Sequence, residues 1–242
     1  MKRRDGVDPS KGGSRSSIIK MFNNIAPKYD RLNALFSFGI DSYWRRKALR
    51  KIDKSNRSIV LDLGSGTGDI ILEAKREGFG KVVCGDISLN MLKVNGSRQK
   101  RRFKEIKSTL INSDAESLPF SGNSFKSCII AFTIRNVERR DRALDEIYRV
   151  LDKNGEVVII EFSIPKSKII SFFYGLYFGK IVKHLGGLLS GDMYAYSYFP
   201  DSVETFPTEE EFVKLLKKSN FSNVKIYSLM FGIATIYAGK KI

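Results

Sequence analysis

Short apolar runs of strand length alternate with polar or amphipathic stretches through the middle of the chain, and this alternation constrains the fold most. The runs are SIVLDLG, KVVCGDI, STLINSDA, FKSCIIAF and GEVVIIEFS. Runs of this kind are typical of strands that are buried on both faces. Strands that alternate with helices build a parallel sheet with helices on both of its sides. The sequence therefore predicts an α/β fold.

The segments that flank this region have other patterns. Residues 1–17 are polar and rich in Gly and Ser, which predicts a mobile basic tail. Residues 18–52 have apolar residues at helical spacing. We therefore expect one domain over residues 18–242, with an N-terminal helical part at 18–55 and a hydrophobic insertion at 165–205.

The C-terminal half contains recognisable helix signals. RALDEIYRVLDKNG predicts a helix that stops at Asn154-Gly155. PTEEEFVKLLKKSN predicts a helix that is capped by Thr208, with glutamates in its first turn. The final stretch, SNVKIYSLMFGIATIYAG, predicts two adjacent strands.

The first predicted strand ends in VLDLGSGTG, a glycine-rich turn that an aspartate precedes. In an open parallel sheet the ligand lies beyond the carboxyl ends of the strands. Dinucleotide-binding folds space their glycines as GxGxxG, whereas Gly64, Gly66 and Gly68 follow GxGxG. Asp62 would repel a pyrophosphate and attract a cationic group, such as an α-ammonium beside a sulfonium. A nicotinamide dehydrogenase is therefore disfavoured.

Two further acids stand at the ends of the next two strands. Asp86 follows Gly64 by 22 positions (86 − 64), close to the roughly 20 expected of an acid that binds ribose hydroxyls. Asp114 can accept a hydrogen bond from an adenine amino group. Each has a structural alternative, a helix cap at Asp86 and an Asx turn at Asp114. Together, acids at three successive strand ends favour a cofactor site.

These motifs resemble the class I S-adenosylmethionine-dependent methyltransferases. Three longer segments resemble the ubiquinone/menaquinone biosynthesis C-methyltransferases: MFNNIAPKYDRLNALFSFGIDSYWRRKAL, FTIRNVERRDRALDEIYRVLDKNGEVVIIEFSIP and YAYSYFPDSVETFPTEEEF. The resemblance runs from about Ile18 to the C-terminus. It implies a Rossmann-like fold with a mostly parallel seven-stranded sheet and an antiparallel C-terminal strand. It also implies S-adenosyl-L-methionine as the cofactor. The cofactor-binding residues that we expect are Asp62, Gly64, Gly66, Thr67, Gly68, Asp86, Asp114 and Ala115.

The implied reaction is methyl transfer to a ring carbon of a prenylated hydroquinone, either demethylmenaquinol or the equivalent ubiquinol precursor. A ring carbon is a poor nucleophile until a hydroquinone hydroxyl loses its proton. A cation near that hydroxyl would lower its pKa, and Arg135 is the candidate. A structural ion pair with Asp141 or Glu138 is the alternative. Asn136 would orient this loop or the substrate.

The remaining candidates surround the expected cofactor. Tyr29 and Asp30 would belong to a lid over the cofactor, or else would be a packing tyrosine and a helix cap. Tyr196 and Tyr198 would contact the quinol ring, or would belong to an aromatic core. In the apolar insertion, Phe173 and Tyr177 are expected to contact the prenyl tail, with an ordinary core helix as the alternative.

Composition limits the other possibilities for partners. The net charge of +16 suits an anionic membrane surface or nucleic acid, and a solvated basic surface explains it equally well. A nucleic-acid partner is not expected, because no separate RNA-binding module is visible. Two cysteines inside apolar runs predict buried thiols, and the single histidine, His184, excludes a zinc site built on several histidines. No metal is expected.

The expected protein is cytoplasmic, with peripheral contact at the inner face of the membrane, and monomer and homodimer both stay open. The apolar stretch from Ile169 to Leu189 is too interrupted by charge for a transmembrane helix. Two alternatives to the quinol reaction also stay open. One is a methyltransferase that acts on RNA or another small molecule, and the other is a non-catalytic cofactor-binding partner in quinone synthesis.

Overall fold

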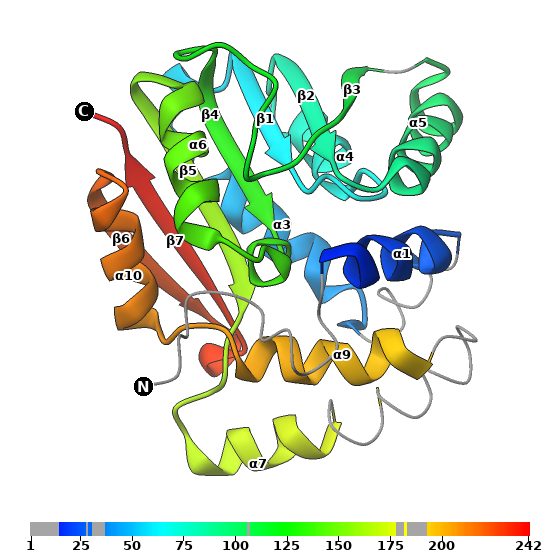
Figure 1. The fold of residues 1–242 in the computed structure, drawn as a ribbon, viewed down its shortest axis with the longest axis vertical. Coiled ribbons are helices and arrows are strands. Elements are labelled where there is room, and N and C mark those ends of the chain that lie inside the picture. Colours follow the sequence, from blue (N-terminus) through cyan, green and yellow to red (C-terminus); the bar gives the residue numbers. More distant parts are fainter. Residues whose placement is uncertain (1–14, 28, 31–36, 106, 178–181, 183–192) are drawn as a thin grey trace.

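A seven-stranded sheet forms the centre of the protein. The computed structural model describes residues 15–27, 29–30, 37–105, 107–177, 182 and 193–242, without the side chains of 193–197. The strands are β1 (Ile59–Leu63), β2 (Lys81–Asp86), β3 (Ser108–Asn112), β4 (Phe125–Ala131), β5 (Leu151–Phe162), β6 (Ser222–Leu229) and β7 (Ala234–Lys240). Their order in the sheet is β3-β2-β1-β4-β5-β7-β6 (Figure 1). Pairing from β3 to β5 is parallel, and β7 runs antiparallel to both β5 and β6. The predicted fold class is confirmed.

Eight helices within the described part of the chain surround the sheet. They are α1 (Arg15–Ile25), α3 (Ile40–Leu49), α4 (Asp69–Arg76), α5 (Leu89–Phe103), α6 (Arg140–Val150), α7 (Lys168–Leu176), α9 (Met193–Glu204) and α10 (Glu209–Lys218). Short 3₁₀ turns η2 (Lys54–Asn56), η3 (Ile134–Asn136) and η5 (Met230–Gly232) complete the connections. None of the helices that the structure describes is long and apolar enough to cross a membrane.

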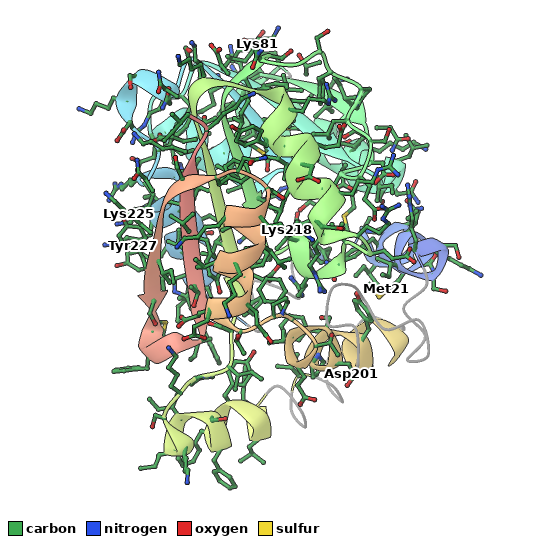
Figure 2. The ribbon with its side chains drawn as sticks, turned by 60° about the vertical axis from the view of Figure 1, so that its left-hand side comes forward. Met21, Lys81, Asp201, Lys218, Lys225 and Tyr227 are labelled. Carbon is green, nitrogen blue, oxygen red and sulfur yellow. The ribbon has the colours of Figure 1, made fainter. Side chains whose placement is uncertain are left out.

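Two apolar layers hold these helices against the sheet. On one face, Leu144 and Ile147 of α6 and Phe212 of α10 are fully buried against the strands, and the two helices lie side by side there (Figure 2). On the opposite face, Trp44 of α3 and Ile71 of α4 are buried in the second layer. The strands between are buried on both faces, as their continuous apolar runs predict.

A third cluster lies at the carboxyl ends of the strands. Ile18, Met21 and Ile25 project from one side of α1 and pack with Met91 of α5 and Tyr198 of α9. This spacing of three and four residues places the apolar side chains of α1 on a single stripe. Helices α1 and α9 therefore lie across the edge of the sheet where a ligand is expected (Figure 1).

Three details of the sequence prediction are wrong. Helix α1 begins at Arg15, inside the predicted tail, and the rest of that tail lies outside the described residues. Strand β3 is only partly buried, because it is the edge strand and no strand covers its outer side. Helix α6 ends at Val150, before Asn154-Gly155, which instead lie in β5 beside an irregularity in its pairing with β4.

Other local predictions are confirmed. Thr208 caps α10 through a capping box with Glu211. Ser222–Leu229 and Ala234–Lys240 pair as adjacent antiparallel strands. Cys84 and Cys128 are free, buried thiols in β2 and β4.

Candidate active site

The glycine-rich turn connects β1 to α4 and has room only for glycine at two positions. Gly64 and Gly68 have φ angles of 71° and 94°, in the left-handed region. A Cβ on Gly64 would lie 2.2 Å from Thr133 Cγ2, and one on Gly68 would lie 2.4 Å from Asn95 Oδ1. The turn therefore packs closely against the β4 end and α5, and leaves its other side open to a pocket.

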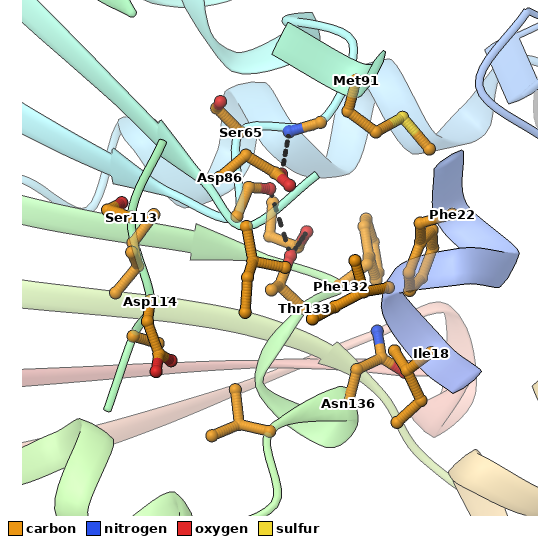
Figure 3. A pocket seen from close by; sticks show the side chains of 18 of the residues that line it. Ile18, Phe22, Ser65, Asp86, Met91, Ser113, Asp114, Phe132, Thr133 and Asn136 are labelled. Carbon is orange, nitrogen blue, oxygen red and sulfur yellow. Dashed lines mark hydrogen bonds between the residues drawn. The ribbon is translucent and has the colours of Figure 1, made fainter. Parts of the chain in front are cut away.

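Asp86 supports this turn from the end of β2. Its Oδ2 accepts a hydrogen bond from Gly66 N at 2.7 Å, and its Oδ1 accepts one from Ser88 N at 2.8 Å (Figure 3). A carboxylate oxygen can accept two such bonds, so each oxygen keeps one acceptor position. The side chain lines the pocket, and burial raises the pKa of Asp86. It is therefore placed to accept two neighbouring hydroxyls.

Asp114 has both a structural partner and a partner across the pocket. Its Oδ1 accepts a hydrogen bond from Glu116 N at 3.0 Å, which makes the Asx turn that the sequence left open. Its Oδ2 pairs with Arg15, which projects from α1 on the other side of the pocket. Asp114 and Ala115 both line the pocket, and α1 closes over it at this point.

The pocket that these elements enclose has a volume of about 1010 Å³, including its open mouth. The hydroxyls of Ser65 and Ser113 are buried in its wall and have no hydrogen-bond partner within the described part of the protein (Figure 3). Buried polar groups without a partner are costly in a folded protein. These hydroxyls, the glycine cradle and the acceptor positions on Asp86 fit the amino-acid and ribose groups of S-adenosylmethionine.

Asp62 lies beneath the turn and not in the pocket wall. It is almost fully buried in β1, and its Oδ1 has no hydrogen-bond partner among the described residues. Burial, and then the charge of Asp86, raise the pKa of Asp62 well above its usual range. A cation held above the turn would favour the ionised form of this carboxylate. Asp62 therefore does not line the pocket as predicted, and its charge would act on a bound ligand only from beneath the turn.

The predicted lid residues lie beside the glycine-rich turn. Thr67 Oγ1 donates a hydrogen bond to Asp30, and Arg98 Nη1 lies 3.0 Å from the Asp30 carboxylate and 2.9 Å from Asp69. Tyr29 lines the pocket beside them. Asp30 thus joins the N-terminal segment to the glycine turn at Thr67.

A second cavity, which we call the substrate cavity, adjoins the first. Its volume is about 1230 Å³ including its mouth, and most of its lining is apolar or aromatic. Four side chains line both spaces: Phe22, Tyr29, Arg45 and Phe132. The two cavities therefore share a wall.

Arg135 lines the substrate cavity and is held by a buried ion pair. Its Nη1 lies 2.8 Å from Glu161 Oε1, and its Nε donates to Ser202 Oγ at 3.2 Å. The ion-pair partner of Arg135 is Glu161 of β5, so the alternative pairing with Asp141 or Glu138 is wrong. Glu138 precedes α6 and Asp141 lies in its first turn, and neither pairs with Arg135. Burial works to lower the pKa of Arg135, but its interactions with Glu161, Tyr29 and Tyr198 together outweigh burial, and the pKa is raised. Arg135 stays a cation, and no residue that the structure describes accepts from its Nη2.

The other predicted substrate residues divide into three outcomes. Tyr198 lines the substrate cavity, and its hydroxyl donates to Asn136 Oδ1 at 3.1 Å, which joins α9 to the cofactor side. Tyr177 lines the cavity too. Phe173 is exposed on α7 and is not among the residues that line the cavity, so its contact with the prenyl tail stays a prediction. The side chain of Tyr196 lies outside the described residues.

Sequence reasoning missed three residues of α3. Asp41, Trp44 and Arg45 all line the substrate cavity. Arg45 pairs with Asp41 and lies 3.4 Å from Asp69. The indole Nε1 of Trp44 is buried and has no partner in the described structure. The only sequence signal was their place within the segment that resembles the methyltransferase family, because their own spacing is that of an ordinary amphipathic helix.

The comparison with known families decides the identity of this site. Residues 11–241 match the model of the ubiE/COQ5 methyltransferase family. The chain belongs to this family. Within the described residues, no group of three or more acidic, histidine or cysteine side chains is placed to hold a metal. As a member of this family, the protein is an S-adenosylmethionine-dependent methyltransferase, and the pocket beside the glycine turn fits that cofactor.

Relatives and solved structures agree with the family. A ubiquinone/menaquinone biosynthesis C-methyltransferase from Geobacter sulfurreducens is 42% identical over 93% of this chain and 88% of its own length. A demethylmenaquinone methyltransferase from Thermus thermophilus is 39% identical over 91% of this chain and its full length. In fold, the chain resembles a SAM-dependent methyltransferase from Thermotoga maritima, with a TM-score of 0.65 at 18% identity over 92% of this chain and 99% of the other.

Proposed function

We propose that this member of the ubiE/COQ5 family transfers the methyl group of S-adenosylmethionine to a ring carbon of a prenylated hydroquinone. The observation that carries the proposal is the substrate cavity, an apolar space that contains two guanidinium groups and shares a wall with the cofactor pocket. An apolar ring and tail fit such a lining, and its few polar groups fit a pair of hydroxyls. The names of the relatives support the same substrate class.

The residues of the chain have distinct roles in this proposal. When bound, S-adenosylmethionine would supply an electrophilic methyl group. Asp86 holds the ribose and the glycine turn holds the amino-acid part. The Nη2 group of Arg135 donates to a quinol oxygen and stabilises its ionised form, which raises the electron density of the ring. Trp44 Nε1 is a further donor for the head group, and the aromatic walls exclude water.

A methyl-transfer assay tests the proposal. Radiolabelled S-adenosylmethionine is incubated without oxygen with chemically reduced demethylmenaquinol, with oxidised demethylmenaquinone, or with bulk RNA. We expect label in the quinol only, because the oxidised ring has no hydroxyl that can ionise. Label in RNA, or cofactor binding without transfer to any prenylated quinol, would contradict the proposal in favour of the RNA-directed or non-catalytic alternative. A parallel series with a ubiquinol precursor assigns the natural quinone.

The prenyl tail suggests where the protein meets its substrate. We propose that α7 and η5 form an apolar face that contacts the membrane surface. Phe172 is 68% exposed and Phe231 is 80% exposed, while Ile169 and Phe173 add to the same face. Lys166, which lies between β5 and α7, is exposed as well and pairs with Glu209 at 2.7 Å. Scattered exposed apolar residues are normal, but several exposed apolar and aromatic side chains within one short helix are typical of interfacial binding.

The double substitution Phe172→Ser and Phe173→Ser should weaken binding to vesicles that contain anionic lipid, because it removes two exposed aromatic rings from this face. The measurement is co-sedimentation with such vesicles, and we expect the bound fraction to fall by about tenfold, with soluble-substrate turnover unchanged. Leu89→Ser is the matched control, since Leu89 is exposed at the start of α5, away from α7 (Figure 1). Equal binding by both variants would exclude this face as the contact.

A further inference from the structure

The substrate cavity contains one carboxylate. Among its described lining residues, Asp41 is the only acidic side chain, and none is a histidine. The single histidine of the chain, His184, lies outside the described residues. Asp41 lies in the first turn of α3, and its side chain is 13% exposed. Asp41 is therefore the candidate proton acceptor among the described residues of this cavity.

The two oxygens of Asp41 are held in fixed positions. Ser37 Oγ donates to Oδ1 at 2.7 Å, and Arg45 Nη1 donates to Oδ2 from one helical turn further along α3. Each oxygen therefore keeps one acceptor position. Arg45 has a second partner, since its Nη2 lies 3.4 Å from Oδ2 of Asp69. Because Arg45 has this second partner, it need not move when its contact with Asp41 changes.

Inferring from this arrangement, and resting on the proposed quinol substrate, we propose that Asp41 is the catalytic residue that accepts the hydroxyl proton of the quinol. Arg45 then stabilises the phenolate that this transfer creates. Before transfer the cavity holds the Asp41 carboxylate, the Arg45 cation and a neutral quinol. After transfer it holds a neutral carboxylic acid, the same cation and a phenolate. The net charge is unchanged, so the step avoids creating an uncompensated charge in an apolar space.

The protons and electrons of the reaction balance. The quinol O–H bond breaks and an O–H bond forms on Asp41. The phenolate directs electron density to the ring carbon, the carbon–methyl bond forms, and the sulfur–methyl bond breaks with its electron pair on sulfur. The methylated ring carbon then loses its hydrogen as a proton to solvent and the ring becomes aromatic again as a phenolate. That phenolate takes the proton back from Asp41, so the carboxylate is restored and no oxidant or reductant is needed.

Other groups near the cavity are less suited to accept this proton. Glu161 is fully buried behind Arg135 and does not line the cavity. Asp30 and Asp69 are paired with Arg98 on the cofactor side. The further titratable or charged groups that face the cavity are Tyr29, Arg135, Tyr177 and Tyr198. A neutral tyrosine and a guanidinium are both donors and cannot act as the base at neutral pH.

Arg45 remains charged through the step. Burial works to lower the pKa of Arg45, but Asp69 and Asp41 together outweigh it, so its pKa is raised. When Asp41 takes up a proton, the new phenolate replaces the lost negative charge beside the guanidinium. Arg45 is therefore a positioning and stabilising group, while Asp41 carries the proton.

The test is Asp41→Asn, which keeps an oxygen for Arg45 but cannot accept the proton. On reduced demethylmenaquinol, kcat should fall on the order of 100-fold or more at neutral pH, the usual range for a lost general base. The ratio of wild-type kcat to variant kcat should decrease by about tenfold for each pH unit, because phenolic hydroxyls ionise without a base near pH 10. A ring-halogenated demethylnaphthoquinol, whose hydroxyl is more acidic, should restore turnover of the variant at neutral pH.

The controls separate this role from folding and from the proposed function. Asp152→Asn is the matched control, since Asp152 is paired with Lys126 far from either cavity, and its kcat should not change. Cofactor affinity of Asp41→Asn, measured by calorimetry, should stay within about threefold of wild type. If Asp41→Asn fails to fold, Asp41→Glu takes its place: kcat at neutral pH should fall, because the longer side chain displaces the carboxylate from the hydroxyl, and alkaline pH and the acidic analogue should restore it. Methyl transfer to the quinol by the wild-type protein tests the proposed function and does not depend on the role of Asp41.

Two outcomes would overturn the inference while leaving the proposed function intact. One is wild-type kcat for Asp41→Asn on the natural quinol. The other is a low kcat that neither alkaline pH nor the acidic analogue restores, which would make Asp41 a structural residue of α3.

Discussion

Replacing Arg135 by methionine will lower turnover of the quinol by about 100- to 1000-fold, the usual cost of removing one preorganised donor from a developing oxyanion. The same substitution will destabilise the protein by about 3–5 kcal/mol, because Glu161 is then left as a buried carboxylate without its cation. We assign the two effects to different nitrogens of one guanidinium group. Nη1 contacts Glu161, while Nη2 is available to the substrate cavity.

A second substitution separates the two effects. In Arg135→Met with Glu161→Gln, the buried charge is gone and the amide can still accept from the backbone N–H of residue 135. Denaturant unfolding should show most of the lost stability restored. Turnover should stay low. Recovery of turnover together with stability would mean that Arg135 acts only through folding.

A surface ion pair gives the matched control for the Arg135 experiment. Lys126→Met breaks the pair with Asp152, in which both side chains are partly exposed. An exposed pair contributes at most about 1 kcal/mol, so neither stability nor turnover should change much. Comparing Arg135→Met with Lys126→Met measures how much burial increases the cost of breaking an ion pair.

The strand pattern and the glycine turn could be predicted because their signals are local. A continuous apolar run predicts a strand that is buried on both faces, and Gly64 and Gly68 occupy positions that exclude a Cβ. Asp86 was predictable because it ends the strand beside the turn, and parallel strand ends meet at one edge. The exposure of β3 was not predictable from its own residues. It depends on the sheet having no further strand on that side.

The substrate side could be predicted only in part, because its contacts join segments that are far apart in the sequence. The Arg135 and Glu161 pair joins η3 to β5, and the Tyr198 and Asn136 bond joins α9 to η3. The sequence pattern does not single out Asp41, because an acidic residue in the first turn of a helix is common. Only the packing of α3 against the sheet turns it toward a cavity.

Asp86→Ala should weaken the binding of S-adenosylmethionine by about 100-fold without unfolding the protein. Hydrogen bonds to a charged acceptor contribute about 1.5–3 kcal/mol each, and about 1.4 kcal/mol corresponds to a tenfold change in affinity. Asp86 keeps one acceptor position on each oxygen for the ribose, and it also holds Gly66 N at 2.7 Å in the turn that carries the amino-acid part. Both contributions are lost together, so the effect exceeds that of one hydrogen bond.

Calorimetric titration of the cofactor into each variant measures this effect. Asp86→Asn provides the graded comparison, because its amide oxygen can still accept from Gly66 N while one ribose acceptor becomes a donor. We expect an intermediate loss for this variant, on the order of tenfold. Thermal unfolding should occur at a modestly lower temperature for both variants, because the buried Ser88 N–H loses its acceptor on Asp86 Oδ1, whereas solvent in the pocket can replace the acceptor of the Gly66 N–H. Unchanged cofactor affinity in Asp86→Ala would show that the carboxylate supports the turn without binding the ribose, and would shift the cofactor contact to the buried hydroxyls of Ser65 and Ser113.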